Sequence, residues 1–153
     1  MIVYRLSLSK YALDLSGRGA ALAGGRWNSK GIWMVYTSDS RALCMAELAV
    51  HLPIGLITKE YQMIRIFIPD SIPVSIINSN SLSKDWSLFP HSLSTKLVGD
   101  AFIKESKYAI LKVPSAVVQG DFNYLINPNH KHANKIKIQK AENFLIDKRM
   151  FKL

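Results

Sequence analysis

The chain has 153 residues, of which 20 are lysine or arginine and 11 are aspartate or glutamate, so its formal net charge is +9. This length is that of one domain, expected to span residues 1–153, and the hydrophobic content of 48% excludes a disordered chain or one that needs disulfides or structural metal. Cys44 is the one cysteine, so no internal disulfide is possible, and a reducing, cytoplasmic setting is expected.

The N-terminal segment predicts a short strand at residues 2–6 and no targeting signal. The first twenty residues lack the hydrophobic run of a secretory signal. Four charged side chains interrupt them: Arg5, Lys10, Asp14 and Arg18. The longest uncharged apolar stretch, residues 48–58, is far shorter than the ~20 residues of a membrane-spanning helix. We therefore expect a soluble protein with no membrane partner.

Residues 17–31 form a glycine-rich segment that holds five of the eight glycines. Such a segment lets backbone approach a ligand closely, and Arg26 adds a planar donor suited to phosphate or carboxylate. The segment lacks the GK[ST] of a Walker loop, and no helix is expected directly after it, as a dinucleotide-binding fingerprint requires. Two interpretations stay equal: a ligand-binding loop, or a structural loop with Arg26 in a salt bridge.

A strand at residues 33–38 and a helix at residues 40–52 are expected next. Either Ser38 or Asp39 is expected to cap the start of this helix, and Pro53 to end it.

Glu47 stands inside the apolar stripe of that helix, because Leu43, Glu47 and Val50 share one face. Burying a carboxylate is costly unless it is paired or used, and buried carboxylates are frequent at working sites. The alternative is a glutamate at the margin of the stripe that reaches solvent or an arginine. Tyr36, near the end of the preceding strand, either opens onto the same cleft or is an ordinary strand aromatic.

Strands outnumber helices in the rest of the chain and do not alternate strictly with them. This order favours a mixed α+β fold, a sheet core flanked by helices, over a doubly wound one. A helix at residues 92–105 carries Leu93, Leu97 and Ala101 on one apolar stripe. The other expected elements are strands at residues 61–69, 72–77, 108–113 and 124–126, a polar excursion at residues 78–85, and one or two strands in the C-terminal tract.

Ser115 follows one of these strands, where loops present functional side chains, although a turn serine is the commoner case. Asn123, Asn127 and His130 form a polar cluster that caps a strand end or lines a pocket, and the structural role is favoured. No GxSxG motif is present and the histidines have no recognisable partners, which argues against a serine triad. His130 with His132 makes a weak metal site at most, so no metal is expected.

More than half of the positive excess lies in residues 131–153, which hold seven basic and two acidic side chains. Such a tract can bind the phosphates of nucleic acid. However, Lys135 and Lys137 alternate with Ile136 and Ile138, the pattern of a half-buried edge strand, and no stacking aromatics are interleaved. The edge strand is therefore favoured over a nucleic-acid patch.

Seven segments occur in a fixed order along the chain: VYRLS, GGRWNSKG, VYTS, AELAVHL, LVGDAF, LKVPSAVV and NYLINPNH. In this order they resemble the RES-domain family, named after its arginine, glutamate and serine, over residues 3–149. Carried over residue by residue, the resemblance assigns Arg26, Glu47 and Ser115 as catalytic and Tyr36 as the pocket tyrosine. The other residues assigned to substrate binding are Gly24, Gly25, Trp27 and Asn28.

The resemblance implies a fold similar to that of ADP-ribosyltransferase toxins and the role of toxin in a bacterial toxin–antitoxin pair. NAD+ is the implied substrate rather than a cofactor, and the nicotinamide–ribose bond is the one cleaved. Glu47 is expected to hold the ribose, Arg26 a phosphate, Tyr36 the nicotinamide or ribose, and Ser115 the ligand or Glu47. The implied partner is a helix-turn-helix antitoxin, with DNA met only through that partner.

The acceptor of the ADP-ribose stays open between water, phosphate and a protein side chain. Depletion of NAD+ by hydrolysis or phosphorolysis is favoured over ADP-ribosylation of a host protein. A small basic nucleic-acid-binding or ribonuclease toxin and a non-enzymatic interaction module remain alternatives. Whether residues 84–100 form a lid over the pocket is also open.

Overall fold

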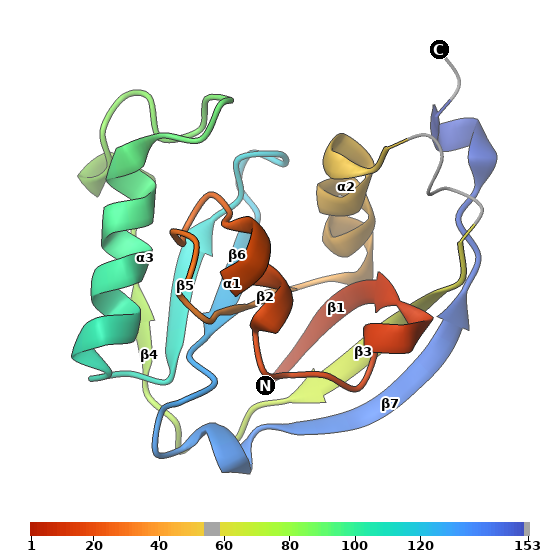
Figure 1. Cartoon of the computed structure of the whole chain (residues 1–153), viewed down its shortest axis with the longest axis horizontal. Helices are drawn as coiled ribbons and strands as arrows, with labels where there is room; N and C mark the ends of the chain where they lie inside the picture. Colours follow the sequence, from red (N-terminus) through yellow and green to blue (C-terminus); the bar gives the residue numbers. More distant parts are fainter. Residues whose placement is uncertain (54–58, 152–153) are drawn as a thin grey trace.

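A single seven-stranded sheet dominates the computed structural model, which describes residues 1–53 and 59–151 (Figure 1). The strand order is β4-β5-β6-β2-β1-β3-β7, and every neighbouring pair is antiparallel except β4 with β5. The strands are β1 Ile2–Leu8, β2 Val35–Ser38, β3 Tyr61–Phe67, β4 Val74–Ile76, β5 Ile110–Pro114, β6 Phe122–Ile126 and β7 Lys137–Phe144. With its three helices, this sheet confirms the mixed α+β fold.

The α-helices of the described residues are α1 Arg18–Ala23, α2 Arg41–His51 and α3 Leu93–Glu105. Short 3-10 turns lie at Ser9–Tyr11, Ser79–Ser81, Ala133–Lys135 and Lys148–Phe151. Helix α2 contacts β1 and β2, whereas α3 lies beside β4 and β5 at the other end of the sheet (Figure 1). None of the helices in the described ranges is long and apolar enough to cross a bilayer.

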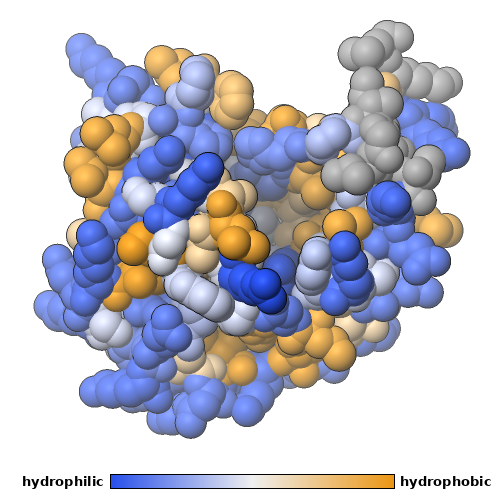
Figure 2. All heavy atoms as spheres, in the orientation of Figure 1, coloured by the Kyte–Doolittle hydropathy of each residue, from blue (hydrophilic) through white to orange (hydrophobic). Residues whose placement is uncertain are grey.

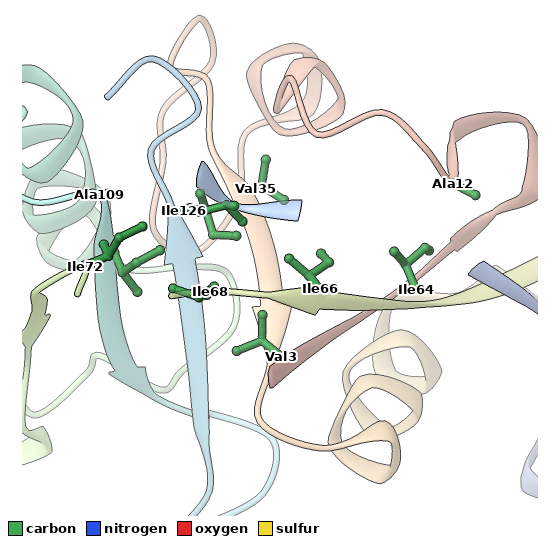
Figure 3. Packing of buried hydrophobic residues seen from close by; sticks show 11 residues of the cluster. Val3, Ala12, Val35, Ile64, Ile66, Ile68, Ile72, Ala109 and Ile126 are labelled. Carbon is green, nitrogen blue, oxygen red and sulfur yellow. The ribbon is translucent and has the colours of Figure 1, made fainter. Parts of the chain in front are cut away.

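Apolar side chains pack on both faces of the sheet, because successive residues of a strand point to opposite sides. On one face, Ile64 and Ile66 of β3 pack in one cluster with Ile110 of β5. Residues from β1, β2 and β6 belong to the same cluster (Figure 3). Leu111 of β5 and Leu125 of β6 belong to a second cluster, which includes Trp27. The second cluster therefore anchors the loop that follows α1.

Helix α1 lies inside the glycine-rich segment, although the glycine content of this segment predicts a loop. Gly17 precedes the helix with φ 79° and Gly24 follows it with φ 70°, in the left-handed region that favours glycine. A Cβ atom at Gly17 would also lie 2.6 Å from the backbone nitrogen of Met34. Two of the glycines in this segment are therefore needed for the backbone conformation at the two ends of α1.

Helix α2 matches the expected element, but its cap is Ser40 rather than Ser38 or Asp39. The Ser40 side chain accepts a hydrogen bond from the backbone N–H of Leu43 at 3.0 Å. The Ser38 hydroxyl instead donates to Asn123 on β6 at 2.7 Å. Ser38 belongs to β2 and is paired in the sheet, so it is not available as a cap.

The stripe expected on α3 is on the wrong face of the helix. Leu93 and Leu97 are 67% and 59% exposed, whereas the buried residues are Thr95, Gly99, Asp100 and Phe102. The reason is a close approach of α3 to the loop after α1: a Cβ atom at Gly99 would lie 1.7 Å from the backbone oxygen of Trp27. Asp100 accepts a hydrogen bond from the Ser29 N–H at 2.9 Å in the same contact.

Replacing Gly99 with alanine is expected to lower the free energy of unfolding by at least about 2 kcal/mol, because α3 must move away from the Trp27 backbone. Urea denaturation measures the change. Gly19→Ala in α1 is the control, since a Cβ atom there meets nothing within 4 Å and alanine favours a helix. Equal stability of Gly99→Ala and the wild type would contradict this packing.

Strand β7 confirms an edge strand in the basic C-terminal tract, but it begins at Lys137, and Lys135 belongs to the preceding 3-10 turn. The strand pairs with β3 at the end of the sheet, with Lys137 exposed and Ile138 half-buried. Lys140 and Arg41 both pair with the carboxylate of Glu142 on this strand. Part of the positive charge is therefore already matched on the protein surface.

Candidate functional site

A cleft of about 470 Å³ opens between α1, α2 and the middle strands of the sheet. Figure 2 shows the hollow near the centre of the face. Its walls come from β1, α1 and the loop after it, β2, α2, and the ends of β5 and β6. The site residues expected from the sequence that line it are Gly24, Gly25, Arg26, Trp27, Tyr36 and Glu47. Helix and sheet thus bring together residues that are far apart in the chain.

Glu47 is held in the cleft by two neutral donors. The Ser115 hydroxyl donates to Glu47 Oε1 at 2.8 Å, and the Asn123 side-chain amide donates to the same oxygen at 2.6 Å. Oε2 has no hydrogen bond to the described part of the chain. One carboxylate oxygen is therefore fixed by Ser115 and Asn123, whereas the other makes no hydrogen bond to the described residues.

Ser115 is 5% exposed and is fixed by its own loop. Its hydroxyl oxygen accepts hydrogen bonds from the N–H groups of Val117 and Val118 at 3.1 Å and 3.0 Å. These bonds direct the hydroxyl proton toward Glu47. Of the two roles expected for Ser115, the structure shows the contact with Glu47.

Asn123 belongs to the site, although its place in the sequence favours a structural role. The amide nitrogen contacts Glu47, and its oxygen accepts the hydroxyl of Ser38. Ser38 and Asn123 are direct partners in the register of β2 and β6, so the sheet places the amide opposite α2. Polar residues at the ends of two paired strands are the sequence signal that indicates such a position.

Arg26 lies in the loop after α1 and lines the cleft without a salt bridge within the described residues. Its Nη1 donates to the backbone oxygens of Trp86 and Leu88 at 2.6 Å and 3.0 Å. Burial lowers the pKa of Arg26, while the negative Glu47 acts against this shift. A guanidinium so placed stays charged and ties the segment before α3 to the cleft.

Tyr36 joins the cleft wall to the loop that carries Arg26. Its hydroxyl accepts the backbone N–H of Trp27 at 3.0 Å and donates to the side-chain oxygen of Asn28 at 2.7 Å. Burial raises the pKa of the Tyr36 phenol, so this group stays protonated. A Cβ atom at Gly25 would lie 2.7 Å from the Tyr36 hydroxyl, which explains the glycine there.

Asn28 is not among the residues that line the cleft. It is fully buried, and its side-chain nitrogen donates to the backbone oxygens of Ala20, Ser29 and Ile32. The side chain therefore braces the loop from behind.

Replacing Tyr36 with phenylalanine is expected to lower the free energy of unfolding by about 1–3 kcal/mol, because Asn28 and the Trp27 N–H lose a buried partner. Chemical denaturation measures the change. Tyr108→Phe is the control, since the Tyr108 hydroxyl makes no hydrogen bond within the described residues. A similar loss in both variants would contradict the bracing role of the Tyr36 hydroxyl.

Cys44 lines the cleft as well, but burial raises the pKa of its thiol to about 11. The thiolate needed for nucleophilic attack is therefore absent at neutral pH. No cluster of three or more histidine, cysteine or acidic side chains suited to a metal ion occurs among the described residues.

A second cavity of about 880 Å³ adjoins the first, and both are lined by Pro114 and Ala116. Ser115 lines the second cavity, together with residues 78–81 and Trp86. The Trp86 ring packs 6.4 Å from the Trp27 ring, between centroids. Ser115 and Glu47 thus lie between two hollows of the surface.

A family model described as RES domain matches residues 2–147. A relative from Sphingobium sp. (strain YBL2), named Prs ADP-ribosylating toxin, is 36% identical over 141 residues, covering 91% of this chain and 88% of the relative. A Pseudomonas putida protein named Toxin Res is 37% identical over 153 residues, covering 99% of this chain and 100% of the relative.

The fold is shared with a chain in the crystal structure of the M. tuberculosis MbcT–MbcA toxin–antitoxin complex. The TM-score is 0.79 at 20% sequence identity, with 94% of this chain and 83% of the other covered.

Proposed function

The chain belongs to the RES domain family, and on this basis we propose that it is the toxin of a bacterial toxin–antitoxin pair that cleaves the nicotinamide–ribose bond of NAD+ in the cytoplasm. The observation that carries the proposal is the state of Glu47. Its Oε1 is fixed by Ser115 and Asn123, and its Oε2 is left unbonded by the described residues, in a cleft that also contains Arg26.

Such a carboxylate suits this reaction. When the bond between nicotinamide and ribose breaks, its electron pair leaves with the neutral amide and needs no general acid. Positive charge then develops on the ribose, and a preorganised carboxylate stabilises it, as in glycoside hydrolysis. The donors on Oε1 keep Glu47 in place, so little reorganisation accompanies the reaction. Oε2 is the oxygen that meets the ribose.

Arg26 supplies the charge for the pyrophosphate of NAD+. Its guanidinium binds phosphate oxygens more strongly than the neutral carbonyls of Trp86 and Leu88 that it contacts in the free protein. Gly24 and Gly25 leave space for the substrate, and the rings of Tyr36 and Trp27 provide apolar wall. Asn28 supports these residues from behind.

The ADP-ribose passes to water or phosphate, which depletes NAD+. Purified protein is incubated with NAD+, with and without phosphate, and the products are resolved by mass spectrometry. Hydrolysis gives ADP-ribose in both samples, and phosphorolysis gives ADP-ribose phosphate only where phosphate is present. Intact NAD+ in both samples, with folded protein, would overturn hydrolysis and phosphorolysis.

ADP-ribosylation of a protein is the second candidate, because the Sphingobium relative that is 36% identical is named an ADP-ribosylating toxin. Incubation of a bacterial extract with labelled NAD+ tests it. Label on a protein band that depends on Glu47 supports this candidate, and label found only in small molecules contradicts it.

The proposed partner is an antitoxin of the helix-turn-helix type that covers the cleft and carries the DNA contact. The M. tuberculosis chain that shares the fold was crystallised in a toxin–antitoxin complex, which supports an antitoxin as the partner. Co-expression with the neighbouring gene and purification through a tag on this chain tests the pairing. A complex without NAD+ cleavage is expected, and full activity of the complex would contradict the blocking role.

A further inference from the structure

Two histidines face the cleft beside Arg26 and have no part in the mechanism above. His51 is the last residue of α2, one turn after Glu47, and His91 lies just before α3. Their rings meet edge to face with centroids 5.9 Å apart, and the Phe89 ring also meets His91 edge to face, at 5.3 Å. Residues from three separate segments therefore converge at this part of the cleft.

This cluster is basic, and it has no ion-pair partner within residues 1–53 and 59–151. The charged and titratable groups that act on His91 are Arg26, His51 and Lys96, all of them basic. Neither His91 nor any of these three basic residues takes part in an ion pair within the described residues. The one carboxylate near Arg26 is Glu47, whose Oε1 is already bonded to Ser115 and Asn123.

The His91 ring also has an unused polar atom. Its Nδ1 is buried and has no hydrogen-bond partner among the described residues. A buried ring nitrogen without a partner costs free energy, so the His91 ring is held in an unfavourable setting in the free protein. Basic side chains around a hollow concentrate anions there.

We propose that His51 and His91 form, together with Arg26, a subsite for a phosphate-type dianion at the mouth of the cleft. The inference rests on the proposed function only in its choice of ligand. The dianion is either the pyrophosphate of the bound dinucleotide, whose two phosphates carry one negative charge each, or the free phosphate that accepts the ADP-ribose. Glu47 lies one helical turn away and keeps its separate role at the ribose.

The subsite predicts proton uptake on binding. Burial, with the positive charge of Arg26, His51 and Lys96, lowers the pKa of His91 in the free protein. A bound dianion raises this pKa again, so binding draws a proton at pH values between the two. Affinity for a dianion therefore rises as the pH falls from about 8 to about 6, around the ordinary value for histidine.

Calorimetric titration with sulfate tests this directly, because sulfate stays a dianion throughout that pH range. For the His51→Gln/His91→Gln double variant we expect affinity at pH 6 about tenfold lower than for the wild type, with proton uptake lost. His132→Gln is the matched control, since His132 forms a similar edge-to-face pair with His130, with centroids 5.2 Å apart, and does not line the cleft. The single variant His51→Gln, at an exposed position, tests the subsite even if the double variant fails to fold.

The source of the dianion is decided by competition between phosphate and ADP. Displacement of phosphate by ADP assigns the subsite to the dinucleotide, and simultaneous binding of both assigns it to the acceptor. No sulfate binding to the wild type, or equal binding to folded wild type and histidine variants, would overturn the subsite. These measurements need no turnover, so a failure of NAD+ cleavage is seen separately.

Discussion

Replacing Glu47 with glutamine is expected to lower the rate of NAD+ cleavage by about 100-fold or more, because the charge that stabilises the developing oxocarbenium ion is removed. The fold is expected to survive, since the glutamine oxygen can still accept the hydroxyl of Ser115. The loss is expected in kcat rather than in KM, because the charge acts mainly in the transition state. Nicotinamide release, measured by chromatography under steady-state conditions, gives both constants.

The matched control for this variant is Glu142→Gln. Glu142 lies on β7, pairs with Arg41 and Lys140, and does not line the cleft, so the same chemical change leaves cleavage intact there. An equal fall in both variants would show a general loss of folded protein. Wild-type activity in Glu47→Gln would contradict the role of the carboxylate.

The second large effect is expected for Arg26→Ala, with KM for NAD+ raised by about 10- to 100-fold through the loss of charge-assisted hydrogen bonds to phosphate. The same variant frees the backbone oxygens of Trp86 and Leu88. Amide hydrogen exchange in residues 83–92 should therefore become faster. Steady-state kinetics and exchange followed by mass spectrometry measure the two effects on one sample.

Arg41→Ala is the control for Arg26→Ala, because Arg41 pairs with Glu142 on the surface of α2 and does not line the cleft. Unchanged KM in Arg26→Ala would contradict a phosphate-binding role. Unchanged exchange in residues 83–92 would show that Arg26 does not hold that segment, which bears on whether residues 84–100 act as a lid.

The positions of the strands were predictable from local pattern, whereas their order in the sheet and the packing of the helices were not. The β-branched and aromatic side chains of residues 61–69 indicate a strand, and β3 occupies most of that range. The alternation of lysine and isoleucine over residues 135–138 indicates an edge strand, although β7 begins only at Lys137. The stripe of Leu93 and Leu97 predicts the wrong face of α3, because Gly99 allows the helix to approach the Trp27 backbone on the opposite side. That contact joins residues 72 positions apart, which periodicity cannot reveal.

The sequence predicts a site residue where its type and position alone indicate a function, but not where its role depends on the folded structure. Glu47 stands out because the sequence places it between Leu43 and Val50 on one face of a helix, where a carboxylate needs a partner or a use. The structure corrects part of that stripe, since Leu43 is buried but Val50 is 58% exposed. Asn123 does not stand out, because its position opposite Glu47 depends on the register between β2 and β6. Asn28 adjoins Arg26 closely in sequence, yet its side chain is buried behind the cleft. Two residues that are close together in a sequence motif can therefore point their side chains in different directions.

The most direct test of NAD+ cleavage is proton NMR of NAD+ incubated with the purified chain alone, with Glu47→Gln and Glu142→Gln in parallel. Free nicotinamide is predicted to appear with the wild type and with Glu142→Gln, and to be nearly absent with Glu47→Gln. Intact NAD+ after incubation with folded wild-type protein, or equal nicotinamide release by Glu47→Gln, would contradict cleavage of NAD+ at Glu47.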